Sequence, residues 1–504
     1  MACDGCAAPS AARIIHSAIL DYSADCAEFC PVPGLNRLLA LGTYQLLEAE
    51  QRRVGRCYLY ALPQRGHASL QPGLLPAAAA ETASGAAACR ANAADSEGAA
   101  AASAALAGGA GCVPVAGPAA TLDMPGVFDI KWAPAAASSI DGMGPRTGTG
   151  DAAMASGAAS GAAAGHAEAA GGVRALLGAA LADGTLRLLE ASLGAGEAAP
   201  LFREVASVEA CAGGGMALSL DWQLGDPAAA ADGDGGDGCG GGGDRIVCSS
   251  SAGTVSVVQV RPSGLELVSE WEAHELEVWC AAWHRHQAHV VFSGADDCYF
   301  KAWDTRAEPA AAVFSNRRTH SAGVCTISPH PVDAHLVATG SYDEHVRLWD
   351  VRNLSKPVVQ TETTTGGGNW RLRWHPHDPH VLLAACMYNG FAVLRSDPGH
   401  TDLQVVATYQ SPNKNIGYGA DWWQEVRDRQ QERAEQEEEA RGAGAAGSEA
   451  QGTAGGEEAG RAAEAAGVSG GGDGGGGGQD GGCWLAATCS FYDKVHTLVW
   501  LPTR

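Results

Sequence analysis

The sequence predicts an all-β protein, a seven-bladed β-propeller in which four-stranded sheets stand around a central axis. Three observations predict this fold. Part of the chain repeats with a spacing of 46 residues, and apolar and polar residues alternate inside the repeat as they do in strands. The rest of the chain divides into further units of about the same length, which gives seven in all.

The repeat is clearest in two neighbouring units. Trp303 and Trp349 open the tetrapeptides WDTR and WDVR and lie 46 residues apart, and His274 and His320 keep the same spacing. A period in the low to middle forties with these residues is typical of a WD-repeat blade. Because a four-stranded blade can bury its faces only against neighbouring blades, the repeat is a packing unit.

The second of these units shows how the strands are arranged. Residues 336–341 are expected to form one strand, 342–344 a tight turn and 345–349 the next strand. In WD-repeat proteins the equivalent His, Ser, Asp and Trp residues form a hydrogen-bonded network inside the blade, which is a structural role. The residues expected to have this role are His274, Asp297, Trp303, His320, Ser341, Asp343 and Trp349.

Five weaker copies complete the ring. The pattern sought is a short strand that ends near a Trp, followed by a second strand, a turn and a third strand. The copies pair 24–30 with 38–47, 127–132 with 175–189, 217–222 with 246–260, 370–374 with 381–394, and 418–423 with 484–500. The last copy is one strand short, whereas residues 13–20 form a spare apolar strand at the other terminus. The N-terminal strand is therefore expected to close the ring, which leaves only short protected edges.

Four segments rich in Ala and Gly interrupt the units, at about 62–123, 135–172, 223–244 and 424–482. All 13 Trp residues lie outside them. Segments with so few large apolar side chains cannot offset the entropy lost on ordering, so they are expected to be disordered or locally helical loops. The predicted organisation is one propeller domain over residues 13–504 that carries four low-complexity insertions.

Composition excludes several classes of function. A formal net charge of −24 gives no general attraction to nucleic acids or anionic membranes, so neither is an expected partner. The chain has no run of 18 apolar residues and no secretory signal, which favours a soluble cytoplasmic protein. Two His-rich segments, 284–289 and 375–380, fall where a blade turns between its first two strands, so exposed turns are expected there rather than metal ligands. No metal or cofactor is predicted.

Several segments depart from the general WD-repeat pattern. They are HELEVW at 274–279, ATGSYDEH at 338–345, GGNWRLRWHP at 367–376, LAACMYNGF at 383–391 and CSFYDKV at 489–495. Taken in order, they closely resemble the diphthine methyl ester hydrolases, the diphthine methyltransferase family of WD-repeat proteins in diphthamide biosynthesis. The resemblance covers nearly the whole predicted propeller and fails in the insertions.

This resemblance implies a substrate and a reaction. The substrate would be elongation factor 2 that carries methylated diphthine, and hydrolysis of one methyl ester would give diphthine and methanol without a cofactor. Diphthine carries a quaternary trimethylammonium group near the ester, and an aromatic-lined cavity would suit such a cation. Candidate substrate-binding residues are Tyr342, Trp370, Tyr388, Tyr418 and Tyr492.

The catalytic residues are harder to predict. Ester hydrolysis needs an activated water or nucleophile, a base, and donors for the developing oxyanion. The resemblance gives no assignment of these roles, so candidates come from turns near the ends of the propeller. They are His345 as a general base, with Glu344 and Asp296 as carboxylates that could assist it.

A second class of function is a binding module without catalysis, because propellers are often interaction platforms and a fold does not dictate function. Both WDxR tetrapeptides, which end at Arg306 and Arg352, resemble the box through which WD-repeat receptors engage cullin-based ubiquitin ligases. The alternative hypothesis is therefore a non-catalytic scaffold, or a substrate receptor that binds a cullin-ligase adaptor through these two arginines.

Overall fold

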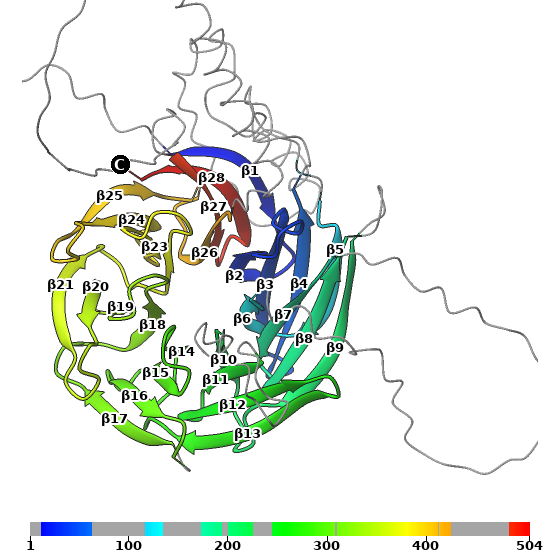
Figure 1. Ribbon diagram of the computed structural model, residues 1–504. Helices are drawn as coiled ribbons and strands as arrows, with labels where there is room; N and C mark the ends of the chain where they lie inside the picture. The colour runs from blue at the N-terminus through cyan, green and yellow to red at the C-terminus, as the bar shows by residue number, and fades with distance from the viewer. Residues whose placement is uncertain are drawn as a thin grey trace, which may run out of the picture.

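The structure is a computed structural model that describes residues 12–62, 115, 117–134, 173–193, 200–224, 244–307, 310–411, 413–424 and 483–503. Within these ranges, 28 strands form seven four-stranded antiparallel sheets, and the sheets stand around a common axis as the blades of a ring (Figure 1). This confirms the predicted all-β seven-bladed propeller. No helix in the described ranges is long and apolar enough to cross a membrane.

The strands of each blade follow one another from the axis outward. Blade 1 contains β2 (Ser23–Phe29), β3 (Leu38–Leu47), β4 (Arg52–Ala61) and β5 (Ala120–Pro125). Blade 2 contains β6 (Val127–Trp132), β7 (Arg174–Leu181), β8 (Thr185–Ser192) and β9 (Leu201–Glu209). Blade 3 contains β10 (Ala217–Trp222), β11 (Arg245–Ser250), β12 (Thr254–Arg261) and β13 (Gly264–Glu272). Blade 4 contains β14 (Cys280–Trp283), β15 (Val290–Gly294), β16 (Phe300–Asp304) and β17 (Ala311–Asn316).

The remaining blades have the same order. Blade 5 contains β18 (Val324–Pro329), β19 (Leu336–Ser341), β20 (His345–Asp350) and β21 (Val358–Thr364). Blade 6 contains β22 (Arg371–Trp374), β23 (Val381–Ala385), β24 (Phe391–Ser396) and β25 (Leu403–Tyr409). Blade 7 contains β26 (Gly417–Trp422), β27 (Cys483–Ser490), β28 (Val495–Pro502) and β1 (Arg13–Ile19).

The first strand of each blade lies nearest the axis (Figure 1). These inner strands, β2, β6, β10, β14, β18, β22 and β26, contact one another in sequence around the ring and run in the same direction. Indole groups link their ends. Trp222 Nε1 donates to the Lys131 carbonyl oxygen at 2.9 Å, and Trp422 Nε1 donates to the Arg373 carbonyl oxygen at 3.2 Å. The end of the ring where the inner strands begin is called the N-terminal end below, and the other the C-terminal end.

The apolar core lies between the blades. Seven clusters of buried apolar residues appear in the described ranges, and each joins two adjacent blades. Strand β23 shows why both faces of a blade must be apolar. Val381, Leu383 and Ala385 pack toward blade 7, whereas Leu382 and Ala384 pack toward blade 5. Alternate residues therefore serve different interfaces, because successive strand side chains point to opposite faces.

The N-terminal strand closes the ring. Strand β1 pairs antiparallel with β28, with Arg13 opposite Trp500 and Ile19 opposite Val495. Ile15 and Leu20 add to the apolar cluster between blades 7 and 1. The closure predicted from the spare strand is confirmed.

The first predicted insertion is too long. Residues 120–123 belong to β5, which pairs with β4, and Leu62 is buried. The prediction fails at these positions because few large side chains surround them in the sequence. The loop character predicted for most of 62–123, 135–172, 223–244 and 424–482 concerns residues outside the described ranges.

The His-rich turns differ from expectation at one histidine each. His286 and His377 are exposed as expected, whereas His284 and His375 are buried. Each ring accepts a backbone N–H at Nδ1, from His286 and His377 respectively, both at 3.1 Å. The histidines therefore fix the turn after the inner strand.

Blade 4 contains the expected polar network. Trp303 Nε1 donates to Ser293 Oγ at 2.8 Å, and Ser293 Oγ lies 2.7 Å from His274 Nε2. His274 Nδ1 lies 3.0 Å from Asp297 Oδ2. Because an indole can only donate, the Ser293 hydroxyl hydrogen is free for His274 Nε2, and His274 Nδ1–H donates to Asp297. Burial lowers the pKa of His274, which favours this neutral ring.

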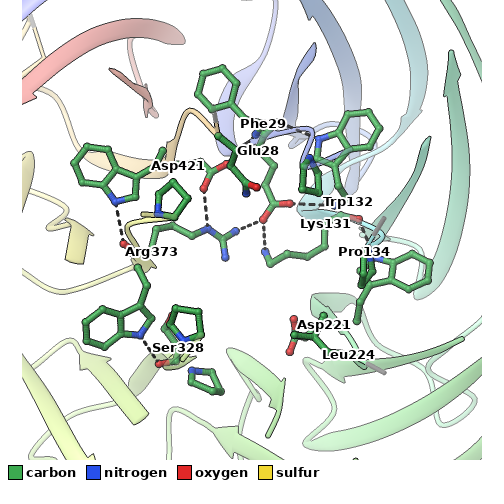
Figure 2. A pocket seen from close by; sticks show the side chains of 18 of the residues that line it. Glu28, Phe29, Lys131, Trp132, Pro134, Asp221, Leu224, Ser328, Arg373 and Asp421 are labelled. Atoms are coloured by element: carbon green, nitrogen blue, oxygen red, sulfur yellow. Dashed lines mark hydrogen bonds and ion pairs between the residues drawn. The ribbon is translucent and has the colours of Figure 1, made fainter. Parts of the chain in front are cut away.

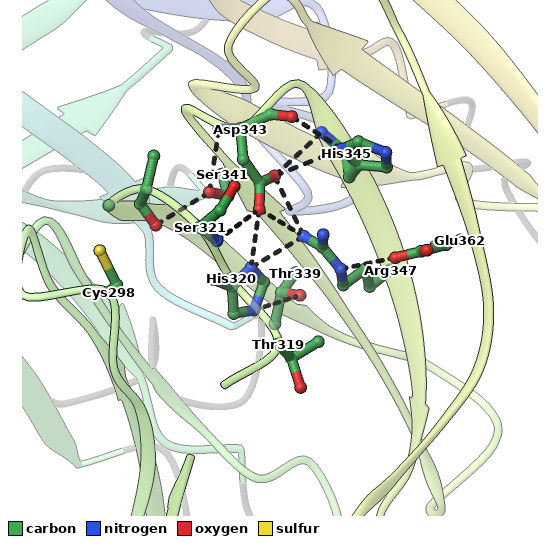
Figure 3. A network of polar contacts seen from close by, with 12 residues as sticks. Cys298, Thr319, His320, Ser321, Thr339, Ser341, Asp343, His345, Arg347 and Glu362 are labelled. Atoms are coloured by element: carbon green, nitrogen blue, oxygen red, sulfur yellow. Dashed lines mark hydrogen bonds and ion pairs between the residues drawn. The ribbon is translucent and has the colours of Figure 1, made fainter. Parts of the chain in front are cut away.

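Blade 5 contains a modified network, in which the hydroxyl bound to Trp349 and His320 belongs to Thr339 rather than to Ser341 (Figure 3). Trp349 Nε1 donates to Thr339 Oγ1 at 2.8 Å, and His320 Nε2 lies 3.3 Å from the same oxygen. Ser341 instead donates to the Ala322 carbonyl oxygen. Ser341 also accepts the Asp343 backbone N–H at 3.1 Å, so it belongs to the network as predicted, although the hydroxyl that matches Ser293 at the repeat spacing is that of Thr339.

We predict that Thr339→Val lowers the free energy of unfolding by about 1 to 3 kcal/mol, because it leaves the buried N–H groups of Trp349 and His320 without an acceptor. Thr339→Ser keeps the hydroxyl found in blade 4 and should cost about 1 kcal/mol or less, the effect of one buried methyl group. Urea denaturation followed by tryptophan fluorescence measures both variants. Equal losses would show that the hydroxyl does not stabilise the blade.

Candidate functional site

Seven aromatic side chains form an arc at the N-terminal end of the ring. Neighbouring ring centroids along it lie 4.7 to 6.4 Å apart. All seven side chains are partly exposed rather than sealed in the core. We call this feature the aromatic arc, and in contact order its members are Phe128, Tyr44, Phe491, Tyr418, Trp370, Tyr342 and Trp279.

Trp370 is the centre of the arc. Its ring stacks on Tyr418 at 4.9 Å and lies 5.5 Å from Trp279 and 6.1 Å from Tyr342. The glycines before Trp370 make this approach possible. A Cβ atom at Gly367 would lie 2.1 Å from the Cys386 carbonyl oxygen, so a larger residue would displace the segment that carries Trp370.

The structure brings together three of the five predicted substrate-binding residues. Tyr342, Trp370 and Tyr418 belong to the aromatic arc. Tyr492 is 67 % exposed and touches the arc through Phe491, with centroids 5.2 Å apart. Tyr388 is 77 % exposed and makes no ring contact within the described ranges. The binding role of all five stays a prediction.

The predicted catalytic residues do not form one cluster. Asp296 lies at the arc, where its Oδ1 accepts the Trp279 indole N–H at 3.1 Å. His345 is bound to its own turn, with Nδ1 2.7 Å from the Asp343 carbonyl oxygen. Glu344 is exposed in that turn with a φ of 68°. No contact among the described residues joins either of them to Asp296, and their catalytic roles stay predictions.

Buried carboxylates on the inner strands link neighbouring blades. Asp421 accepts the Phe29 backbone N–H at 2.8 Å, and Asp221 accepts that of Trp283 at 2.9 Å. Glu28 and Asp129 do the same, the first from Trp132 at 3.0 Å and the second from Leu220 at 3.1 Å. Each carboxylate satisfies a buried donor on the next inner strand, which is a structural role.

Asp25 on β2 is the exception among these carboxylates. It is 1 % exposed, and neither of its oxygens has a hydrogen-bond partner in the described part of the chain. Burial raises the pKa of Asp25 to about 7, and the Asp129 carboxylate adds to the rise while Arg371 and Lys131 oppose it. An unpartnered buried carboxyl is costly, so its presence calls for a function.

The neighbours of Asp25 hold a second carboxylate ionised. Arg371 Nη1 lies 2.9 Å and Lys131 Nζ 2.8 Å from Asp129 Oδ1. Burial alone would raise the pKa of Asp129, but these cations outweigh it, and the pKa lies below its usual value. Two adjacent carboxyls whose pKa values are pushed apart are typical of acid and base chemistry.

A cavity of about 450 Å³ lies at the C-terminal end of the ring (Figure 2). Charged side chains enter it but pair with one another. Lys131 lies 3.3 Å from Glu28, Arg373 contacts Glu28 and lies 3.6 Å from Asp421, and a further pair joins Arg285 to Asp221. Because these partners are fixed within the ring, the cavity offers less chemistry than the arc.

The described residues contain no group of three or more His, Cys, Asp or Glu side chains arranged to hold a metal ion. The two WDxR arginines are exposed at the ends of their strands. Arg306 pairs with Asp304 and Arg352 with Asp350, each within its own tetrapeptide. Binding of a cullin-ligase adaptor through them stays a prediction.

Comparison with known proteins places the chain in a family. The model of the WD domain, G-beta repeat, matches residues 265–304 and 313–350. Diphthine methyltransferase of Mus musculus is 31 % identical over 428 residues, which cover 81 % of this chain and 69 % of that protein. The Homo sapiens diphthine methyltransferase is 29 % identical over 80 % of this chain and 73 % of its own length. A Dictyostelium discoideum homologue is 35 % identical over 41 % of this chain and 55 % of its own. The chain therefore belongs to the diphthine methyltransferase family.

Proposed function

We propose that this protein acts in diphthamide biosynthesis and hydrolyses the methyl ester of methylated diphthine on elongation factor 2. The products are diphthine and methanol. Family membership supports the pathway, and the aromatic arc is the observation in this structure that supports the site.

The arc suits the cationic part of such a substrate. A trimethylammonium group has no N–H to donate, so it is recognised by the faces of aromatic rings rather than by hydrogen bonds. Partly exposed aromatic side chains lie together at the N-terminal end of the propeller. The successive centroids of Trp279, Trp370 and Tyr418 are 5.5 and 4.9 Å apart. Asp296, bound to Trp279, adds a negative charge beside these rings.

Hydrolysis has to be distinguished from methyl transfer, because the relatives are named methyltransferases. Transfer of a methyl group to diphthine would need a methyl donor, and the methyl content of the product would rise. Hydrolysis needs only water, and the methyl content falls by one. The two reactions therefore change the mass of the modified peptide in opposite directions.

We predict that the purified protein removes one methyl group from elongation factor 2 bearing the methylated diphthine ester, with no added cofactor. Mass spectrometry of the modified peptide and an assay for methanol measure the reaction. A parallel incubation contains S-adenosylmethionine and elongation factor 2 with the demethylated side chain. Methyl gain in that incubation, with no methanol in the first, would support transfer and contradict hydrolysis.

The role of the arc is tested at Tyr418, which stacks on Trp370. Tyr418→Leu should raise KM by roughly 2- to 30-fold, the value of one cation–π contact of about 0.5 to 2 kcal/mol. Choline should inhibit the wild type in competition with substrate, whereas its neutral isostere 3,3-dimethylbutanol should not. The measurement is initial rate against substrate concentration at several inhibitor concentrations.

Tyr418→Phe is the matched control, because it keeps the aromatic face and removes only the hydroxyl. It should retain the KM of the wild type and its inhibition by choline. If the Phe and Leu variants are affected equally, the aromatic face does not bind the cation. Inhibition by both choline and the neutral compound would indicate simple apolar burial.

A further inference from the structure

We propose that the Asp25 carboxylate is the general base that activates water for ester cleavage at the N-terminal end of the ring. This inference rests on the proposed function and extends it to a residue of β2 that no sequence motif indicates. Asp25 would take a proton from the attacking water and then return it to the leaving methoxide.

The first support is the isolation of Asp25. Of the five buried carboxylates on the described inner strands, Glu28, Asp129, Asp221 and Asp421 each accept a backbone N–H from the neighbouring inner strand. Asp25 accepts none, and both of its oxygens are buried and unpartnered. Among the described residues, no backbone donor therefore takes up its acceptor capacity. Burial raises its pKa, and the one neutral side-chain donor that acts against this rise is the Trp370 indole N–H of the arc.

The second support is its position beneath the aromatic arc. Asp25 lies at the register shift of β2 directly after Ala24, which pairs with Thr43, the neighbour of Tyr44. A Cβ atom at Gly419, next to Tyr418, would lie 3.0 Å from Cys26 Cα. Burial raises the pKa of both Tyr44 and Tyr418, and the Asp25 carboxylate contributes to each rise. The Trp370 indole N–H favours the ionised form of Asp25, and its nitrogen is buried and has no hydrogen-bond partner among the described residues. An ester held beside a trimethylammonium group in the arc would thus approach Asp25.

The third support is the charge around Asp25, which leaves it ready to exchange a proton near neutral pH. Burial raises its pKa to about 7, where general-base catalysis is most effective. Arg371 pairs with Asp129 at 2.9 Å, so the positive charge of Arg371 does not stabilise the Asp25 carboxylate alone. The titratable and charged groups that surround Asp25 are Asp129 and Lys131 on β6, Arg371 on β22, Tyr44 on β3, Tyr418 on β26, Cys26 on β2 and Cys489 on β27.

The step balances without a further reactant. The water oxygen forms a bond to the ester carbonyl carbon while Asp25 takes one water proton. The tetrahedral intermediate then collapses, the bond from carbon to the methoxy oxygen breaks, and Asp25 returns the proton to that oxygen to give methanol. The new carboxylic acid releases its own proton to solvent. Because Asp25 is only 1 % exposed, the rings of the arc must part for the ester to reach it.

We predict that Asp25→Asn lowers kcat by about 10²- to 10⁴-fold, the usual contribution of a general base, and changes KM less than about threefold. In the wild type, kcat should rise with pH through an apparent pKa near 7, and this limb should be absent from the residual activity of the variant. Methanol release at pH 5 to 9 measures both. Competitive inhibition by choline should persist in the variant, which shows that the arc is intact.

Asp421→Asn is the matched control, because Asp421 is an equally buried carboxyl whose pKa burial also raises to about 7. It lies at the C-terminal end and should keep kcat within about threefold of the wild type. An unchanged kcat in Asp25→Asn would overturn the assignment, and a large loss in His345→Ala beside it would favour His345. A rise in KM with loss of choline inhibition would make Asp25 a counter-ion instead. Absence of methanol release by the wild type would overturn the proposed function itself.

A stability measurement tests the same group without substrate. The pKa of Asp25 is raised from an ordinary value of 3.8, so between about pH 4 and pH 7 the unfolded chain releases a proton that the folded protein keeps. Folding stability should therefore fall through this range on account of Asp25. Asp25→Asn removes that loss. The melting temperature of the variant minus that of the wild type should therefore be larger at pH 8 than at pH 4. A pH-independent difference would show that Asp25 titrates normally and would overturn its role as a base.

Discussion

The burial of each blade against its two neighbours is the interaction on which the rest of the structure depends. A blade has two apolar faces and no partner within itself, so its core exists only as an interface, as the opposite-facing residues of β23 show. The core is thus divided into seven parts around the ring, and none is sufficient alone. Without closure, two of these faces would meet water. Closure by β1 removes that cost and fixes the positions of all seven inner strands.

A second constraint acts on the inner strands. Their buried backbone N–H groups and charged side chains lie close together around the axis, and each needs a partner. Carboxylates such as Asp421 and Asp221 resolve it by accepting N–H groups from the next strand. The network holds the strands at a constant offset, which in turn places one aromatic ring beside the next at the N-terminal end. Asp25 does not take part in this arrangement. The free-energy cost of burying Asp25 without a partner is tolerated because packing at the seven blade interfaces fixes the backbone of β2.

The fold could be predicted because a repeated blade produces a periodic pattern of residues in the sequence. The offset that links Trp303 to Trp349 also implies stacked blades, and the spare strand at residues 13–20 implies closure. The site could not be predicted in the same way. Phe128 and Trp279 join the arc through Tyr44 and Trp370, which lie far from them in the sequence, so no local pattern marks them. Three arc residues are predictable only through the resemblance of their segments to a family. Asp25 carries no signal at all, since burial without a partner is a property of the folded state. The place of Thr339 in the blade 5 network could also be predicted, because the spacing that links Ser293 to Thr339 is present in the sequence.

Ring closure has a consequence for the order of events during synthesis. Strand β1 is made before every other described strand and its partner β28 after every other, so their pairing closes a loop that spans all seven blades. Asp25 lies in blade 1 and Tyr418 in blade 7, and the apolar interface between these blades includes Ile15 of β1 and Trp500 of its partner strand β28. That interface is therefore complete only after β28 has been made. A truncated chain that lacks β28 would leave β1 without its partner and would open the ring at blade 7.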